Sequence, residues 1–225
     1  MSGALSQGRG KFITLEGGEG AGKSTQARLL AEHLRSLGHD CVITREPGGS
    51  PVAEALREVI LSGVTAPLGP SAETVLFAAA RIDHVAQTIL PALARGAFVI
   101  CDRFTDSTRV YQGALGKVDP ALISTLEEIA AGRCRPDLTL ILDLPAQIGL
   151  ARAAARRAEQ AADRFEAEGL AYHEGLRAAF LEIAGNEPGR CKVVDAAKGP
   201  DDVAQAILAA VQHLLGPAPA KAEAP

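Results

Sequence analysis

Short apolar runs rich in β-branched residues recur along the chain, and segments whose apolar residues have helical spacing separate them. The runs predict five strands, at Lys11–Glu16, Cys41–Glu46, Ala97–Asp102, Leu138–Leu144 and Lys192–Asp195. The segments between them predict helices at Lys23–Leu37, Val52–Leu61, Glu73–Arg95, Pro120–Ala131, Ala146–Arg157, Leu170–Ala184 and Asp201–Leu215, with Pro91 kinking or breaking the third. This alternation predicts an α/β fold, a five-stranded parallel sheet with helices on both faces.

Composition and charge narrow the class of protein. Of the 225 residues 47% are apolar, which suits helices packed on a buried sheet and excludes a disordered or fibrous chain. A net charge of −4 argues against a protein that coats nucleic acid by general electrostatics. We expect a cytoplasmic protein with no membrane partner, because no segment has the apolar length of a signal peptide or of a membrane span.

We expect one domain at residues 11–215, since no interior stretch has the composition of a linker. The ends, residues 1–10 and 216–225, are typical of flexible tails. The four cysteines are widely scattered, with no C-x-x-C pair and no histidine at ligand spacing. Free buried thiols are therefore the interpretation that we prefer to disulfides or a zinc site.

Residues 17–24 match the pattern G-x-x-x-x-G-K-[S/T] between a predicted strand and a predicted helix. In that setting the glycines let successive N–H groups face phosphates, and the helix N-terminus adds partial positive charge. We expect Lys23 to reach the β- and γ-phosphates and Ser24 to ligate Mg²⁺. The alternative is a glycine-rich turn with a chance lysine, which the order of strand, loop and helix disfavours. The expected nucleotide-binding residues are Gly17, Gly18, Glu19, Gly20, Ala21, Gly22, Lys23, Ser24 and Thr25.

Charged residues follow the next predicted strands, at the sheet edge where ligands of open parallel sheets bind. Arg45 precedes a Pro-Gly-Gly turn and is a candidate phosphate ligand, although it could also be an exposed charge beside an ordinary turn. Asp102 is a candidate partner of Ser24 on Mg²⁺, and Arg103 a candidate for neutralising phosphoryl charge. A structural Asp–Arg pair is the alternative there. Asp143 has no arginine beside it, so we expect it to be structural.

Several strings together resemble the bacterial thymidylate kinase family, in the branch whose catalytic arginine comes from the lid. They are the phosphate loop after Glu16, Thr-Arg-Glu-Pro-Gly-Gly at 44–49, Leu-Phe-Ala-Ala-Ala-Arg at 76–81, Asp-Arg at 102–103 and Tyr-Gln-Gly at 111–113. The resemblance implies a P-loop nucleoside monophosphate kinase fold that transfers the γ-phosphoryl group of ATP to dTMP with Mg²⁺, for dTTP synthesis and DNA replication. It also implies a homodimer, in which the alanine-rich helices Glu73–Arg95 and Pro120–Ala131 could pack against a twofold mate, although the same faces could equally be buried within the monomer.

The resemblance also implies roles on the acceptor side. Phe77 would stack on thymine and Arg81 would donate to its O4, as suits a donor-only guanidinium facing a carbonyl. An aromatic residue in an alanine-rich helix is ordinarily core, which is the alternative for Phe77. Tyr111 would pack against the deoxyribose. The whole expected substrate set is Arg45, Phe77, Arg81, Arg103, Ser107, Thr108, Tyr111 and Gln112.

Phosphoryl transfer between two phosphates needs positioning and cations more than a general base. Residues 150–166 resemble the lid of these kinases, and Arg152, Arg156, Arg157 and Arg164 lie in it. Gly20 stands where one branch of the family has a loop arginine, so the lid is expected to supply that charge, with Arg156 and Arg157 as first choices beside Lys23 and Arg103. A solvated basic helix face is the alternative.

Two other functions remain open from the sequence. A deoxynucleoside kinase would phosphorylate a hydroxyl and would need a carboxylate base, for which Glu16 or Glu46 is available. A nucleotide-dependent switch would need no phosphoryl acceptor, and would leave Arg45, Phe77, Arg81 and Tyr111 without a shared purpose.

Overall fold

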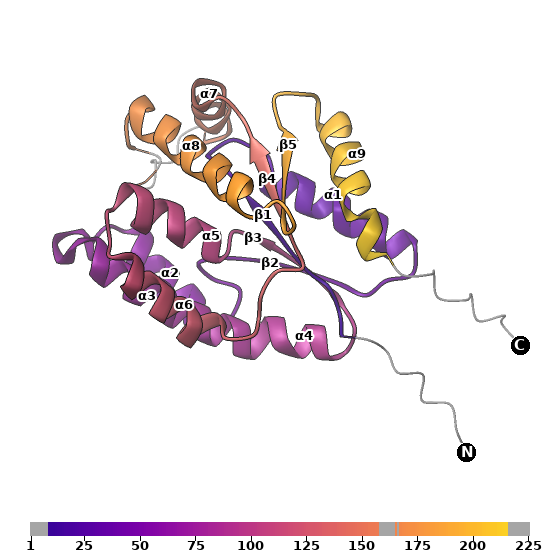
Figure 1. Ribbon diagram of the computed structural model, residues 1–225, viewed down its shortest axis with the longest axis horizontal. Helices are drawn as coiled ribbons and strands as arrows, with labels where there is room; N and C mark the ends of the chain where they lie inside the picture. The colour runs from indigo at the N-terminus through magenta and orange to yellow at the C-terminus, as the bar shows by residue number, and fades with distance from the viewer. Residues whose placement is uncertain (1–8, 158–164, 166, 216–225) are drawn as a thin grey trace, which may run out of the picture.

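The computed structural model describes residues 9–157, 165 and 167–215. Its centre is one parallel sheet in the order β2-β3-β1-β4-β5 (Figure 1). The strands are β1 (Phe12–Glu16), β2 (Cys41–Arg45), β3 (Phe98–Asp102), β4 (Leu138–Asp143) and β5 (Cys191–Asp195). Each begins and ends within one residue of its predicted position, so the predicted α/β class and strand number are confirmed.

Helices cover both faces of the sheet. Helix α1 (Lys23–Ser36) and helix α9 (Pro200–Val211) pack on one face, where Leu34 and Ile207 join a core with Ile13 of β1. On the other face Ile89 packs against Phe12 and Val99. The residues of β1 thus alternate between two buried faces, which is why all of them are buried, including the polar Thr14 and Glu16.

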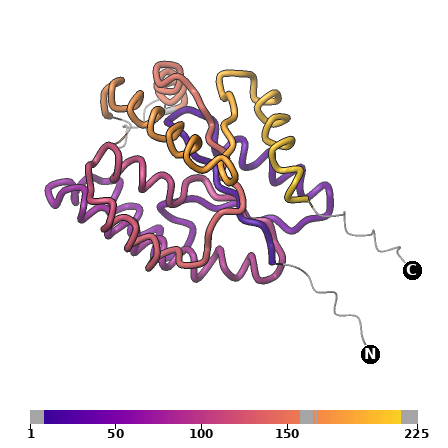
Figure 2. Tube along the Cα trace, in the orientation of Figure 1, coloured from indigo at the N-terminus to yellow at the C-terminus, as the bar shows by residue number. Residues whose placement is uncertain are grey.

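The remaining helices lie mostly to one side of the sheet. They are α2 (Pro51–Leu61), α3 (Gly69–His84), α4 (Leu90–Ala94), α5 (Thr105–Thr108), α6 (Pro120–Ala131), α7 (Ala146–Arg157) and α8 (Leu170–Asn186), with short 3₁₀ turns at Ala66–Leu68 and Gln212–Leu214. Helices α2, α3 and α6 run side by side, as the trace in Figure 2 shows. Helix α8 packs on β4 and β5, where Phe180 contacts Ile141.

The third predicted helix is longer and less regular than expected. It begins at Gly69 rather than at Glu73, and a π-helical segment at Val85–Ile89 separates α3 from α4. Pro91 lies in the first turn of α4, where a missing N–H is tolerated. The expected disturbance near Pro91 is therefore present as a π-helical segment, and the chain stays helical through it.

The segment after β3 was not predicted to be helical. It contains α5 and a π-helical segment at Arg109–Leu115, and together they carry Ser107, Thr108, Tyr111 and Gln112. Polar residues and a glycine give this segment no helical spacing of apolar residues. Its helical form depends instead on a contact with β1, described below.

Other expectations concern boundaries and membranes. Gly10, placed in the N-terminal tail, donates its N–H to the carbonyl of Leu93 at 2.9 Å, so the ordered fold includes it. Cys41, Cys101, Cys134 and Cys191 are buried free thiols, as expected. Over the described ranges, no single helix has the length and apolar character of a membrane span; residues 51–61 and 66–94 pass that test only as a pair bent by 82°.

Candidate active site

The carboxyl ends of β1, β2 and β3 open into a cleft of about 320 Å³. Most of the predicted residues come together there from the phosphate loop, the strand ends, α3, the α5 region and α7, but Gly17 and Gly18 are not among its lining residues. Those that line it are Glu19, Gly20, Ala21, Gly22, Lys23, Ser24, Thr25, Arg45, Phe77, Arg81, Asp102, Arg103, Ser107, Thr108, Tyr111, Gln112 and Arg156. Segments separated by more than a hundred residues thus share one cavity.

The phosphate loop joins β1 to α1 with the lysine folded back over it. Lys23 Nζ donates to the carbonyls of Gly17 at 3.1 Å and Gly18 at 2.9 Å. Gly20 and Gly22 have positive φ angles of 68° and 87°, the region that glycine adopts without strain. Burial, and then the nearby charge of Arg103, lower the pKa of Lys23. The loop therefore holds a cation directly above a helix N-terminus, an arrangement suited to phosphates.

Backbone contact joins the phosphate loop to the first half of α7. A Cβ atom at Gly20 would overlap the carbonyl oxygen of Gly149, and a Cβ atom at Gly149 would overlap the carbonyl oxygen of Glu19. The two main chains lie too close for any side chain between them. This contact sets the position of α7, and with it that of Arg156, relative to the loop.

Oxygen donors suitable for Mg²⁺ lie beside the loop. Ser24 Oγ donates to Asp102 Oδ2 at 2.6 Å, so a hydroxyl and a carboxylate meet at the edge of the cleft. A hard cation that is shared with phosphates needs only one or two protein oxygens, and these two fit that requirement. No cluster of three or more His, Cys, Asp or Glu side chains that could hold a metal occurs in the part of the chain described.

Arg103 lines the cleft beside the phosphate loop. Its Nη2 pairs with Glu19 Oε1 at 2.5 Å, and its Nη1 donates to the Gly17 carbonyl and to Ser107 Oγ, both at 3.2 Å. The guanidinium also lies 5.0 Å from the ring centroid of Tyr111. Although burial opposes its ionisation, the charges of Arg103 and Lys23 lower the pKa of Glu19 to about 2. The site therefore keeps this carboxylate ionised beside two cations.

A positive φ angle accompanies the position of Arg103. Its φ is 71°, in the left-handed region that residues with a Cβ rarely adopt. The Arg103 N–H bonds to the carbonyl of Leu15 at 2.9 Å, which secures this turn to β1. Such strain is typical of positions whose side chain must point in one direction.

Arg45 lies at the outer rim of the cleft. Its side chain is 55% exposed and pairs with Glu54 Oε2 at 3.0 Å. The neighbouring Arg57, which the sequence did not single out, also lines the cleft and donates to the Pro47 carbonyl at 2.7 Å. Two arginines thus face the same opening, near the turn at residues 47–49.

Arg81 is the most deeply enclosed arginine of the cleft. Only 3% of its side chain is exposed; Nε donates to Glu46 Oε2 at 2.7 Å and Nη2 to Thr108 Oγ1 at 3.0 Å. Its guanidinium lies 5.2 Å from the Phe104 ring centroid. Phe77, one turn earlier on α3, is half-buried and lines the cleft. The alternative that Phe77 is an ordinary core residue did not predict this position.

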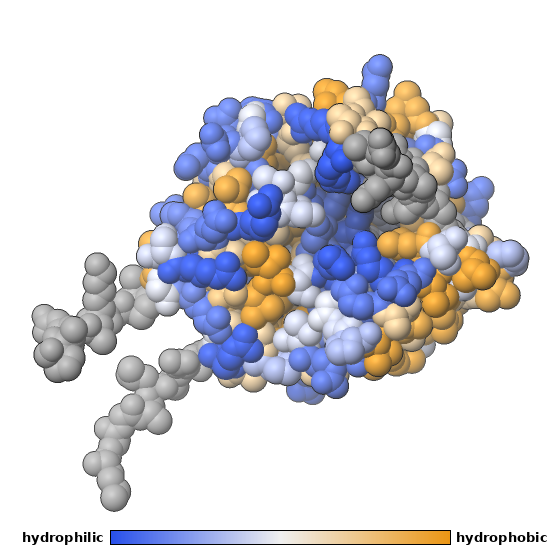
Figure 3. Space-filling model, turned by 180° about the vertical axis from the view of Figure 1, so that it is seen from behind, coloured by the Kyte–Doolittle hydropathy of each residue, from blue (hydrophilic) through white to orange (hydrophobic). Residues whose placement is uncertain are grey.

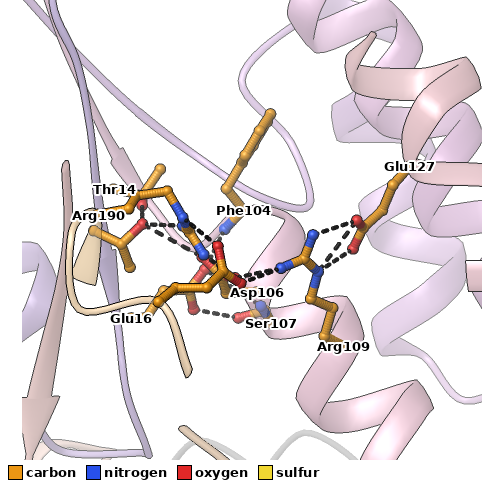
Figure 4. Close-up of polar contacts among 10 residues, drawn as sticks. Thr14, Glu16, Phe104, Asp106, Ser107, Arg109, Glu127 and Arg190 are labelled. Carbon is orange, nitrogen blue, oxygen red and sulfur yellow. Dashed lines mark hydrogen bonds and ion pairs between the residues drawn. The ribbon is translucent and has the colours of Figure 1, made fainter. Parts of the chain in front are cut away.

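Buried polar side chains hold the α5 region against the sheet (Figure 4). Glu16 Oε1 accepts from the N–H groups of Phe104 at 2.7 Å and Ser107 at 3.3 Å, and its Oε2 accepts from Ser107 Oγ at 2.7 Å. This carboxylate caps the start of α5. Burial, and then the charge of Asp106, raise the pKa of Glu16 to about 7.

Asp106 anchors the same region from its other side (Figure 4). Arg190 binds both of its carboxylate oxygens, at 2.7 and 2.9 Å. Arg109 pairs with Glu127 of α6 at 2.8 Å and approaches Asp106 Oδ1 at 3.5 Å. These ion pairs connect α5, α6 and the loop before β5, and they fix the helical segment that carries half of the acceptor-side residues.

The two candidate carboxylate bases of the deoxynucleoside kinase hypothesis are both engaged. Glu16 does not belong to the cleft lining, and both of its oxygens accept hydrogen bonds. Glu46 lines the cleft, but its oxygens are bound to Arg81 and His84. Neither is arranged to take a proton from a hydroxyl acceptor.

The lid residues are described only in part. Arg156 lines the cleft, whereas Arg152 donates to the carbonyl of Ala196 at 2.9 Å, beyond β5. The side chain of Arg157 and all of Arg164 lie outside the described residues, as do residues 158–163 and 166 of the predicted lid and the ends at 1–8 and 216–225. Asp143, expected to be structural, binds Arg177 through both oxygens at 2.7 and 3.0 Å.

Several residues of the cleft were not among the expected nucleotide-binding, substrate-binding or catalytic residues, although Glu46 was considered as the base of a deoxynucleoside kinase. They are Glu46, Pro47, Arg57, Leu61, Phe104 and Phe165. Glu46 and Pro47 belong to the Thr-Arg-Glu-Pro-Gly-Gly string, so that string was a usable signal. Phe165 packs edge-on against Tyr111 with ring centroids 5.5 Å apart, a contact across 54 positions that no local pattern reveals.

Comparison with known proteins agrees with this geometry. A sequence model described as thymidylate kinase matches residues 15–207. Thymidylate kinases of Bradyrhizobium sp. (strain BTAi1) and Afipia carboxidovorans are each 57% identical to this chain, over 92% and 96% of both chains, respectively. The crystal structure of thymidylate kinase from Ehrlichia chaffeensis superposes with a TM-score of 0.71 at 31% identity, covering 91% of this chain and 99% of that one. The chain belongs to the thymidylate kinase family.

Proposed function

We propose that this thymidylate kinase, which transfers the γ-phosphoryl group of ATP to dTMP to give ADP and dTDP, divides its cleft into a donor half and an acceptor half. The observation that carries the proposal is the single cavity lined by both Lys23 of the phosphate loop and Arg81 of α3. A switch that only binds and hydrolyses one nucleotide has no use for the acceptor-side residues around Arg81. Two nucleotides meeting in one water-restricted space is the arrangement that phosphoryl transfer requires.

The donor half is the phosphate loop with the start of α1, residues 17–25. Loop N–H groups and Lys23 bind the phosphates of ATP. Ser24 and Asp102 would hold Mg²⁺, which supplies positive charge to the β- and γ-phosphate oxygens when bound. The 2.6 Å hydrogen bond between Ser24 Oγ and Asp102 Oδ2 supports this shared role, because both oxygens lie close enough together beside the phosphate loop to bind one ion.

The acceptor half begins with the residues around Arg81. Arg81 donates to the thymine O4, Phe77 stacks on the base, and Tyr111 packs against the deoxyribose; Thr108 and Gln112 complete the wall. The support for Arg81 is that it is buried yet lines the cleft, since a fixed guanidinium that carries only donors selects for an acceptor. Thymine has a carbonyl at that position, whereas cytosine has an amino group.

Cations between the halves act on the transferring group. Arg45 and Arg103 bind the acceptor phosphate, which is largely a dianion near neutral pH and needs no general base. Ser107 positions Arg103 through its 3.2 Å bond. Arg156 and Arg157 supply the charge over the γ-phosphate, and the place of Arg156 in the cleft lining supports its share of that role.

We further propose that the enzyme is a cytoplasmic homodimer. Exposed apolar side chains gather on α2, α3 and α6, and include Val52, Val75, Ile82 and Ile129. Apolar surface is visible at the lower right of Figure 3, the side where these helices lie in that view. Ile82→Glu should convert the dimer to a monomer in light scattering, whereas Val193→Glu, on exposed β5, should not. If light scattering shows that the native protein is a monomer, the proposed homodimer is refuted.

Two substitutions test the donor half and the acceptor half of the cleft independently. Arg81→Ala should raise KM for dTMP far more than KM for ATP, because it removes a contact to the base only. Lys23→Ala should lower kcat severely with little effect on the affinity for dTMP. Steady-state rates across dTMP, dUMP, dCMP, AMP and thymidine give the comparison. Preference for unphosphorylated thymidine, or equal losses in both variants, would refute the assignment.

A further inference from the structure

Behind Arg81 lies a second layer of buried polar side chains, formed by Thr44, Glu46 and His84. Glu46 Oε2 accepts from Arg81 Nε at 2.7 Å, and Glu46 Oε1 lies 3.0 Å from His84 Nδ1. His84 Nε2 in turn lies 2.6 Å from Thr44 Oγ1. The side chains of Glu46 and His84 are 5% and 0% exposed. We call these three residues the Arg81 support.

The direction of the hydrogen bonds in the Arg81 support follows from the groups involved. Arg81 is a donor only, so Glu46 faces it as an acceptor. Glu46 Oε1 also needs a donor, which requires the hydrogen of His84 on Nδ1. Each polar atom of the carboxylate and of the ring therefore has a partner, and a fully satisfied buried group has one low-energy orientation.

Arg81 is held from three directions as a result. Glu46 binds Nε, Thr108 binds Nη2, and the Phe104 ring lies against the guanidinium plane at 5.2 Å. Nη1 has no hydrogen-bond partner within residues 9–157, 165 and 167–215, and Arg81 lines the cleft. The two N–H donors of Nη1 are thereby left for a ligand. A guanidinium held in this way cannot turn aside for an amino group.

The turn at Pro47-Gly48-Gly49 closes over the Arg81 support. Gly49 has a φ of 86°, and a Cβ atom there would overlap both Thr44 Oγ1 and His84 Nε2. The N–H of Gly49 donates to Glu54 Oε1 at 2.8 Å, and the same Glu54 pairs with Arg45. The supports of Arg45 and Arg81 thus meet at one glycine, which gives the Thr-Arg-Glu-Pro-Gly-Gly string a physical reason.

We propose that His84 and Glu46 are positioning residues for base selection, which act by holding Arg81 so that it rejects an amino group at the 4-position of the pyrimidine. This rests on the role proposed above for Arg81. The penalty for a mismatched donor is large only where the site cannot relax. Without His84, Glu46 loses one of its two partners and Arg81 gains freedom to turn, so selectivity falls before phosphoryl transfer does.

The test compares binding and turnover in matched variants of the full chain. His84→Phe keeps a ring of similar size but removes both nitrogens, His84→Asn keeps a donor near the Nδ1 position, and Glu46→Gln removes the negative charge. Arg81→Ala is the reference, and His33→Phe on the exposed side of α1 controls for the substitution itself. The readouts are Kd values for dTMP and dCMP from calorimetry, with kcat and KM for each acceptor and for ATP.

We expect His84→Phe to lower the ratio of dTMP to dCMP affinity by about tenfold, with kcat for dTMP and KM for ATP changed by less than about threefold. Glu46→Gln should act in the same direction, and His84→Asn should recover part of the ratio. A merely structural role would reduce kcat for every acceptor together and would leave the ratio intact. If His84→Phe does not fold, Thr44→Val takes its place in the test. It removes only the hydroxyl and should lower the ratio of dTMP to dCMP affinity in the same direction, by a smaller factor.

The outcomes separate the two proposals. If Arg81→Ala leaves the dTMP to dCMP ratio unchanged, the role of Arg81 itself is refuted. If the ratio falls in Arg81→Ala but stays at the native value in His84→Phe, Thr44→Val and Glu46→Gln, Arg81 reads the base and the positioning role is refuted.

Discussion

Ser24 Oγ and Asp102 Oδ2 lie 2.6 Å apart, although 78 positions separate them in the chain. One belongs to the first turn of α1 and the other to the last position of β3. The parallel pairing of β1 with β3 places Asp102 opposite Leu15, and so brings it to the phosphate loop that follows β1.

This pairing predicts how the enzyme responds to Mg²⁺. Ser24→Ala and Asp102→Asn should each raise the Mg²⁺ concentration for half-maximal activity and lower kcat by roughly 10- to 100-fold, with KM for dTMP little changed. Initial rates over a Mg²⁺ titration give these values. Ser36→Ala is the matched control, because the Ser36 hydroxyl bonds only within α1, to the His33 carbonyl. Native Mg²⁺ dependence in both variants would contradict the pairing.

Three arginines on helix α7 should differ in their effects. Arg156→Ala and Arg157→Ala should lower kcat at least tenfold, and more in combination, with smaller changes in either KM, because they act on charge that develops during transfer. Arg152→Ala should mainly lower thermal stability, since Arg152 binds the Ala196 carbonyl. Steady-state kinetics and thermal unfolding measure the contrast. A native rate in the Arg156 and Arg157 double variant would eliminate the lid from catalysis.

The ion pairs of Asp106 should dominate the stability of the acceptor wall. Asp106 is fully buried with two charge-assisted bonds from Arg190, and removing its charge leaves Arg190 with Glu187 as its remaining carboxylate partner. Asp106→Asn should lower the free energy of unfolding by about 3–5 kcal/mol, measured by urea denaturation. Asp40→Asn breaks a pair with Arg95 whose partners are 57% and 50% exposed, and should cost less than about 1 kcal/mol. Equal losses of unfolding free energy in Asp106→Asn and Asp40→Asn would refute this prediction.

Stability should also depend on pH through Glu16. Its pKa is raised from 4.5 to about 7 by burial and by Asp106, so between these values the folded state binds more protons than the unfolded state. The contribution of Glu16 to stability therefore falls as pH rises through this window. From about pH 5.5 to about pH 8 the native protein should lose about 2 kcal/mol relative to Glu16→Gln, which cannot ionise. Parallel urea curves with a constant difference would count against this titration.

What the sequence could predict depends on how local each feature is. All five strands are short runs rich in apolar and β-branched residues, so the hydrophobic pattern alone located them to within one residue, even though the edge strands β2 and β5 are only partly buried. The phosphate loop was equally accessible, because its chemistry lies in eight consecutive residues. The reaction and the acceptor residues came from resemblance to a family, and only the strings at 44–49 and 76–81 made that resemblance specific.

The features that escaped prediction are contacts between distant segments. Helix α5 begins where Glu16 accepts from the N–H groups of Phe104 and Ser107, about 90 positions away, and no local pattern contains that information. Likewise, Arg45 looked like an uncommitted phosphate ligand, but it pairs with Glu54. The partners of Arg81 were unknowable for the same reason, since their pairing depends on how α3 packs beside β2.

The contact between Gly20 and Gly149 gives a reason why the loop has no arginine at position 20. A side chain there would need space that the main chain of α7 occupies, at a φ angle of 68° that residues with a Cβ avoid. An arginine at position 20 is therefore sterically incompatible with the observed packing of α7 against the loop. Single substitutions at position 20 therefore meet a steric barrier whatever their charge, because the main chain of α7 would have to move before any side chain could fit there.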